Sequence, residues 1–165
     1  MAEDTSHYSA GRSFLMYWGP VLAMFGLMFF ASTDALSGEN TRSIIEHIFL
    51  WFTPNASPHT IRKFNFIVRK TAHFTEYALL AWLIFRAFRG ASRERWRIQW
   101  ALLTIAIIIS WSLVDEWHQT FTRTRGGSIY DSMLDATGGL FVIALITIYH
   151  WIKKTNSAKR AQPSP

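Results

Sequence analysis

Long apolar segments dominate the pattern of hydrophobic and polar positions. Three segments, 14–31, 98–114 and 136–152, contain no formally charged residue. Each is about as long as the roughly 17–25 mainly apolar residues that a membrane-spanning helix needs. A fourth segment, 71–85, is shorter and must include the apolar residues of 64–68 to cross a hydrocarbon core of about 30 Å. The pattern therefore predicts an all-α fold, a four-helix transmembrane bundle.

The loop between the first two predicted spans contains another helical pattern. In the stretch SIIEHIFLWF, apolar residues recur at Ile44, Ile48 and Phe52 and at positions beside them. This spacing is typical of one face of a helix. We interpret the stretch as an interfacial helix that lies on the membrane or caps the bundle, and Pro54 and Pro58 end it.

Composition supports a membrane protein. Half of the residues are hydrophobic and 17% are charged, against about 25% in soluble domains. The first apolar segment exceeds the core of about 7–15 residues that a secretory signal peptide carries, so we interpret it as a retained span. The chain has no cysteine, which excludes disulfide and thiol chemistry.

Basic residues predict the orientation of the bundle. The link RAFRGASRERWR carries five Arg, the tail KKTNSAKRAQPSP carries four basic residues, and the N-terminal segment carries Arg12. Basic residues accumulate in cytoplasmic segments, so four spans place both termini in the cytoplasm. The predicted organisation is a cytoplasmic N-terminus at 1–13, a membrane domain at 14–152 and a disordered cytoplasmic tail at 153–165. Since topology accounts for the Arg cluster, we predict no nucleic-acid partner.

Polar residues gather at the outer ends of three predicted spans. Lys70, His73 and Glu76 follow one another at intervals of three residues, which puts them near one helix face. Ionisable groups at membrane depth are costly and usually face a bundle interior or an aqueous cavity. We therefore expect one polar cavity open to the outside. Its expected members are His73, Glu76, Glu116, Gln119, Arg125, Asp131 and Asp135.

Several residues in or near the expected cavity also have a purely structural interpretation. Lys70 fits a side chain anchored at the interface, and Asp115 fits a carboxylate in water at a helix end. Ser128 and Asp131 fit the start of a helix, where both would act as caps. The glycine pair at 138 and 139 fits close packing between helices.

The stretches RKTAHFTEYALLAWL, SLVDEWHQTF and RGGSIYDSMLDATGG, in this order, resemble the VanZ-like family of bacterial integral membrane proteins. The resemblance covers residues 62–142 and implies a four-span protein of the inner membrane. Arg123 departs from a common proline, and Val142 departs from a common glycine. The family's recurrent polar positions fall on Lys70, His73, Tyr77, Glu116, Gln119, Arg125, Ser128, Asp131 and Gly138.

The family takes its name from a contribution to resistance against glycopeptide antibiotics, notably teicoplanin. The resemblance implies a role in the cell envelope and leaves both the reaction and any cofactor open. An outward polar site suits an anionic envelope component, such as a lipid-linked precursor, held among membrane lipids. The alternatives are a binder or transporter of an anionic lipid or drug, and a structural protein whose charges pair within the bundle.

The candidate site residues carry distinct roles in this hypothesis. Acid–base chemistry is assigned to three of them, and anion binding to the others. We predict no metal site, because suitable ligand types are present but no diagnostic spacing is. The candidate catalytic residues are His73, Glu76 and Glu116. The candidate ligand-binding residues are Lys70, Tyr77, Gln119, Arg125, Ser128, Asp131 and Asp135.

Overall fold

The computed structural model describes residues 4–32, 38–121 and 129–160, and these residues form helices joined by short links. No strand occurs among them, which confirms the predicted all-α class. The helices are α1 (Asp4–Ala31), α2 (Gly38–Phe52), α3 (Pro58–Arg89), α4 (Ile98–Gln119) and α5 (Ile129–Arg160).

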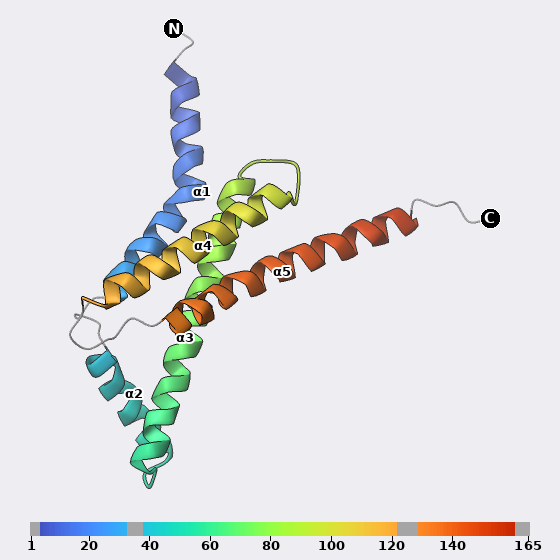
Figure 1. Cartoon of the computed structure of the whole chain (residues 1–165). Coiled ribbons are helices and arrows are strands. Elements are labelled where there is room, and N and C mark those ends of the chain that lie inside the picture. The colour runs from blue at the N-terminus through green and yellow to red at the C-terminus, as the bar shows by residue number, and fades with distance from the viewer. Residues whose placement is uncertain (1–3, 33–37, 122–128, 161–165) are drawn as a thin grey trace.

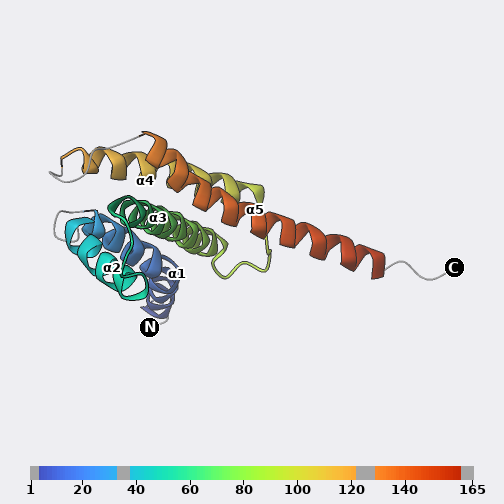
Figure 2. The same cartoon turned by 90° about the horizontal axis from the view of Figure 1, so that it is seen from below.

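The central helix is α3, which packs against every other helix. Figure 1 shows α4 crossing the upper part of α3 and the start of α5 crossing its middle, while α1 lies beside its upper part and α2 beside its N-terminal part. Seen from below, α4 and α5 lie side by side, α3 lies in the middle, and α1 and α2 lie on its other side (Figure 2). Any side chain on the inner face of α3 therefore meets at least one neighbouring helix.

Among the described residues, three helices are long and apolar enough to cross a membrane. The candidate spans are Gly11–Ala31 in α1, Ile98–Gln119 in α4 and Tyr130–Lys159 in α5. They match the three longest apolar segments of the sequence. α3 carries polar residues in its middle and is less apolar than these three helices, so its role as a fourth span stays a prediction.

The start of α3 explains how α2 and α3 form a helical hairpin. Ser57 caps α3 through its side-chain oxygen, which accepts a hydrogen bond from the Thr60 backbone N–H, and Pro58 occupies the first turn. The ring of Phe49 in α2 stacks on Phe64 in α3 at 4.2 Å between centroids. The predicted helix in the first loop is thus confirmed as α2, while its placement along a membrane surface stays a prediction.

Both end helices extend beyond the predicted membrane domain. α1 begins at Asp4, and α5 continues to Arg160. The predicted disorder of 153–165 therefore differs from the structure as far as Arg160, and 161–165 lie outside the described residues. Lys, Ala and Arg in this segment are good helix formers, and the first proline after α5 is Pro163.

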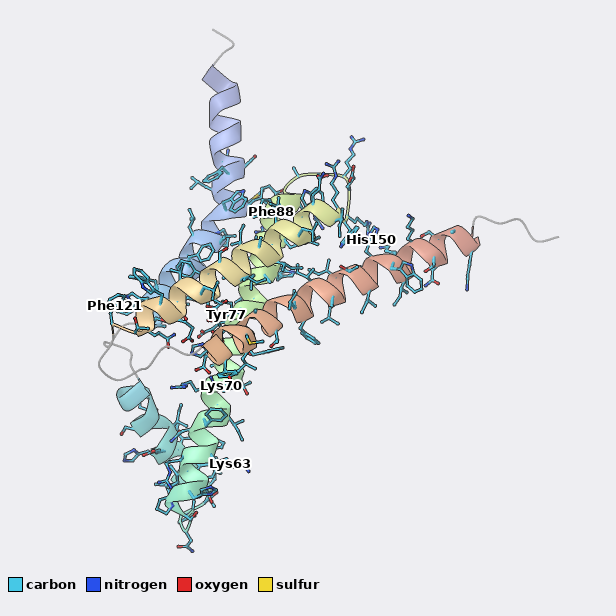
Figure 3. The ribbon with its side chains drawn as sticks, in the orientation of Figure 1. Lys63, Lys70, Tyr77, Phe88, Phe121 and His150 are labelled. Atoms are coloured by element: carbon cyan, nitrogen blue, oxygen red, sulfur yellow. The ribbon has the colours of Figure 1, made fainter. Side chains whose placement is uncertain are left out.

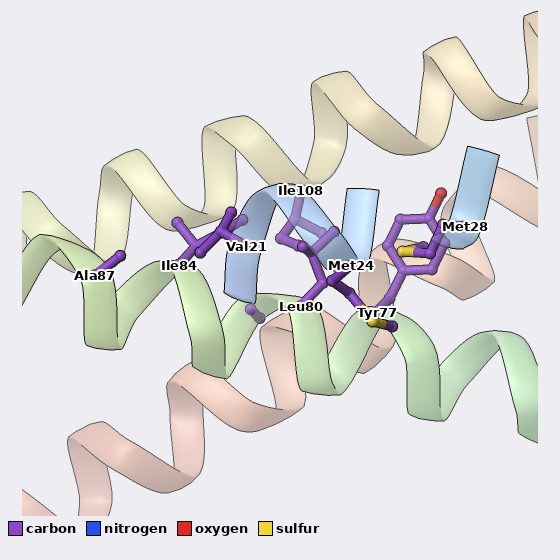
Figure 4. Packing of buried hydrophobic residues seen from close by; sticks show 9 residues of the cluster. Val21, Met24, Met28, Tyr77, Leu80, Ile84, Ala87 and Ile108 are labelled. Carbon is purple, nitrogen blue, oxygen red and sulfur yellow. The ribbon is translucent and has the colours of Figure 1, made fainter. Parts of the chain in front are cut away.

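An apolar core joins α1, α3 and α4. Val21, Met24 and Met28 lie on one face of α1 and pack against Leu80 and other buried residues of α3 (Figure 4). Outward-facing residues of the spans are also apolar, which suits helices surrounded by lipid. The core residues labelled in Figure 4 are Val21, Met24, Met28, Tyr77, Leu80, Ile84, Ala87 and Ile108.

α5 approaches its neighbouring helices closely at its glycine pair. A methyl group on Gly138 would overlap the backbone carbonyl of Phe74 and lie 3.3 Å from the backbone nitrogen of Ala78. A methyl group on Gly139 would lie 2.8 Å from the side chain of Ile108. The pair therefore seats α5 against α3 and α4 at once, which confirms the predicted packing role of these glycines.

Candidate functional site

Two pairs of ionisable residues connect α3 to α5. Lys70 forms an ion pair with Asp131, and the Nδ1 atom of His73 lies 3.4 Å from Oδ1 of Asp135. Each pair is one helical turn from the other, because Lys70 and His73 are three residues apart and Asp131 and Asp135 are four apart. Figure 3 shows Lys70 and Tyr77 on the part of α3 that the start of α5 crosses.

The two pairs differ in their access to solvent. The Lys70 and Asp131 side chains are 16% and 28% exposed. Arg69 is more exposed, and its Nη2 atom lies 3.8 Å from Oδ2 of Asp131. Asp135 is only 1% exposed. Lys70, Arg69 and Asp131 therefore form the rim of the site, while the His73–Asp135 pair lies inside the bundle.

The end of α4 brings a third helix to this site. Asp115, Glu116 and Gln119 are all buried there. Oδ1 of Asp115 accepts a hydrogen bond from the Ser32 hydroxyl at 2.5 Å, and Oδ2 accepts one from the Gln119 amide at 3.0 Å. The interpretation of Asp115 as a carboxylate in water is wrong, because the last turn of α4 packs against the end of α1.

Three helices converge on one small volume. Ligand-type atoms of His73 in α3, Asp115 in α4 and Asp135 in α5 all lie within 4.8 Å of one another. Of the predicted site residues, His73 and Asp135 belong to this trio directly. Gln119 belongs to it through its hydrogen bond to Asp115.

Other predicted residues lie around this trio. Tyr77 is completely buried one turn beyond His73, and Glu76 is half-buried on α3. Glu116 is buried beside Asp115. Arg125 and Ser128, together with the predicted RGGS turn, lie outside the described residues, so their share in the site stays a prediction.

Sequence reasoning missed two residues at the centre of the site. Asp115 continues the buried face of α4, whose members recur at intervals of three or four residues. Ser32 likewise continues the face of α1 that carries Met24 and Met28. If the three- and four-residue spacing of these buried faces is continued to the ends of the helices, it predicts both Asp115 and Ser32. The buried face of α4 consists of Ala101, Thr104, Ile108, Ser112, Asp115, Glu116 and Gln119.

Two buried polar atoms of the site lack a hydrogen-bond partner in the part of the chain that the structure describes. They are Oδ2 of Asp135 and the hydroxyl oxygen of Tyr77. Buried polar groups in proteins are normally paired with protein, water or a ligand. A water molecule or a ligand in the site would supply such a partner.

The opposite end of the bundle is basic. A pocket of about 630 Å³ lies between the end of α3, the following link and α5, near His150 in Figure 3. Its one acidic residue is Glu94, whose carboxylate accepts hydrogen bonds from the Arg97 guanidinium. These hydrogen bonds hold the pKa of the Glu94 carboxyl below its usual value. Basic residues thus dominate this end, whereas the buried carboxylates lie at the other end, beside Lys70 and Arg69. The cationic side chains of the pocket are Arg86, Arg89, Arg93, Arg95 and Lys153.

The trio can move protons, and it can bind a cation. An imidazole whose Nδ1 faces a carboxylate keeps Nε2 for proton transfer. Two carboxylates and an imidazole are also ligand types for a divalent ion. The cationic rim formed by Lys70 and Arg69 can meet an anion that approaches this interior.

Comparison with known proteins agrees with the fold and with the motifs. The sequence model of the VanZ/LLP1 family matches residues 16–150, which include most of α1 and the whole of the site. Searches of curated proteins and of solved structures gave no match. Since the family match covers most of the chain and the helices are long and apolar, this is a membrane protein that belongs to the VanZ/LLP1 family.

Proposed function

We propose that this VanZ-family protein binds, and acts on, an anionic component of the cell envelope at a polar site on the extracytoplasmic side of the inner membrane. The observation that carries the proposal is the convergence of His73, Asp115 and Asp135 from three helices. Buried ionisable groups in a membrane protein are costly, and they commonly mark a functional site.

The surroundings of the rim favour an amphiphilic ligand. Lys70 and Arg69 present positive charge beside Asp131, and Arg125 is expected to add to it. Phe66 and Tyr130, on α3 and α5 near this rim, are 56% and 78% exposed. A lipid-linked envelope precursor would place its anionic head on the cations and its hydrocarbon chain against these apolar surfaces.

His73 is the residue best placed for acid–base chemistry. Asp135 orients its ring through Nδ1, and a proton could be exchanged at Nε2 with a hydroxyl or phosphate group of the ligand. Glu116 and Glu76 are further candidate acids or bases. Binding or transport without reaction remains the alternative within this proposal. A contribution to teicoplanin resistance would follow if the ligand were a cell-wall precursor.

The competing hypothesis is structural, because the contacts of Lys70 with Asp131 and of Ser32 with Asp115 also hold the helices together. The substitution Glu116→Gln distinguishes the two hypotheses, since it keeps the size of the side chain, removes the negative charge and replaces one accepting oxygen by an NH2 donor. We expect normal yield of folded protein and at least tenfold weaker binding of extracted lipid-linked precursor, on the order of 1.4 kcal/mol. Teicoplanin susceptibility should rise in parallel.

The control for this experiment is Thr75→Val, on the exposed face of α3, where the hydroxyl bonds only to Thr71 of the same helix. Folded yield is measured by elution as a single species in detergent. Loss of folded yield together with binding in Glu116→Gln would support the structural hypothesis instead. Mass spectrometry of the precursor after incubation then separates turnover from simple binding.

The proposed orientation has its own test. Reporter fusions at Ser92 and Asn156 should be active in the cytoplasm, and a fusion at Asn55 should be active outside. The reason is the basic pocket, which lies at the ends of α3 and α5 next to Ser92 and which the positive-inside rule assigns to the cytoplasm. An external signal at Ser92 would move the acidic site to the cytoplasmic side and overturn its proposed access to envelope precursors.

A further inference from the structure

We propose that His73, Asp115 and Asp135 form a binding site for one divalent transition-metal ion. Each residue comes from a different helix, and each offers one ligand-type atom within 4.8 Å of the other two. This inference rests on the proposed function, because it concerns the same site and identifies how an acid-lined interior could receive an anion.

The geometry is close to that of a metal site. Nitrogen and oxygen ligands at about 2.0–2.2 Å from a common ion lie no more than about 4.4 Å apart. Only two ligands on opposite sides of the ion reach this limit, and tetrahedral ligands lie about 3.4 Å apart. Nδ1 of His73 and Oδ1 of Asp135 already have this separation of 3.4 Å, and side-chain torsions would bring Asp115 closer to them. Hydrogen bonds to both oxygens of Asp115, from Ser32 and Gln119, hold this carboxylate in place. Such supporting bonds are usual around ligating carboxylates.

A second observation points to a missing partner at this place. Asp135 is 1% exposed, and its Oδ2 atom has no hydrogen-bond partner within residues 4–32, 38–121 and 129–160. The hydroxyl of the fully buried Tyr77, one turn from His73, also lacks a hydrogen-bond partner among the described residues. An ion with a bound water would give the carboxylate oxygen a ligand and offer the hydroxyl a partner.

The charges of the trio also fit a divalent ion. Two ionised carboxylates with a neutral imidazole carry a charge of about −2, which one divalent cation neutralises. Imidazole favours Zn²⁺ and related ions, while carboxylates also suit Mn²⁺. A bound ion of this kind could hold a phosphate or carboxylate of the envelope ligand, and Lys70 at the rim would bind the same anionic head.

Metal binding can be measured directly on the whole chain, purified without a histidine tag and treated with EDTA. Titration calorimetry with Zn²⁺ and with Mn²⁺ should give one ion per chain. Asp115→Asn and Asp135→Asn should each weaken binding roughly tenfold or more. Glu94→Gln, which removes a carboxylate at the opposite end of the bundle, should bind as the unmodified protein does.

A second experiment looks for a new absorption band, which a misfolded variant would not produce. The chain has no cysteine, so His73→Cys introduces a single thiol. This variant should bind Co²⁺ with a thiolate-to-metal charge-transfer band, and adding Asp135→Asn should abolish the band. The unmodified protein should show no such band.

The outcomes separate this inference from the proposed function. Failure of folded protein to take up Zn²⁺ or Mn²⁺, or unchanged uptake by both Asn variants, would overturn the metal site. Precursor binding in EDTA that still depends on Glu116 would leave the proposed function in place. One bound ion per chain without any precursor binding would support the metal site and contradict the proposed function.

Discussion

Gly138→Ala should separate α3 from α5 and prevent most of the protein from folding. The added methyl group would overlap the carbonyl of Phe74, and backbone atoms of a central helix cannot move aside as a flexible side chain can. Overpacking of this kind costs about 3 kcal/mol or more. The displacement would also pull Asp135 away from His73. Elution as a single species in detergent, and the midpoint of unfolding in SDS, measure the loss.

The matched control is Gly26→Ala, another glycine-to-alanine change within a helix. Nothing lies within 4 Å of the position that its methyl group would take. Removing a glycine from a helix interior stabilises the helix by up to about 1 kcal/mol, so this variant should fold at least as well as the unmodified chain. Equal behaviour of the two variants would show that the contact between Gly138 and α3 does not determine the packing.

Periodicity predicted that the polar residues of α3 share a helix face. The spacing of Lys70, His73 and Glu76 placed them near one face of α3, and the structure pairs two of them with acids of α5. Spacing alone does not say which helices are neighbours. The contact of His73 with Asp135 and that of Ser32 with Asp115 therefore could not be predicted.

The misinterpretation of Asp115 has a physical origin. A carboxylate at the end of an apolar run resembles a residue leaving the membrane for water, which is the cheaper state for an isolated charge. Here the end of α1 and the Gln119 amide supply hydrogen bonds, so the carboxylate stays inside. The grouping of His73, Asp115 and Asp135 was not predicted from the sequence for a related reason, since the three residues come from three helices and have no short characteristic spacing.

The pair of His73 and Asp135 should dominate the stability of the polar site. His73→Phe keeps a ring of similar size and leaves Asp135, which is 1% exposed, without its imidazole. Removing one partner of a buried pair costs about 3–5 kcal/mol, because the remaining charge has lost its compensation. We expect this loss in the free energy of unfolding by SDS, measured in EDTA so that no metal ion contributes. His47→Phe, on the exposed face of α2, should have little effect.

The double variant His73→Phe with Asp135→Leu should regain most of that stability, because apolar side chains of similar volume can replace a buried charged pair at little cost. Recovery would show that the bundle does not need these charges in order to fold. A double variant that folds normally but no longer binds the lipid-linked precursor would then assign the pair to function. The single variant Asp135→Leu completes the comparison. If the stability loss of the double variant equalled the sum of the losses of His73→Phe and Asp135→Leu, the two side chains would not interact, which would contradict the site geometry.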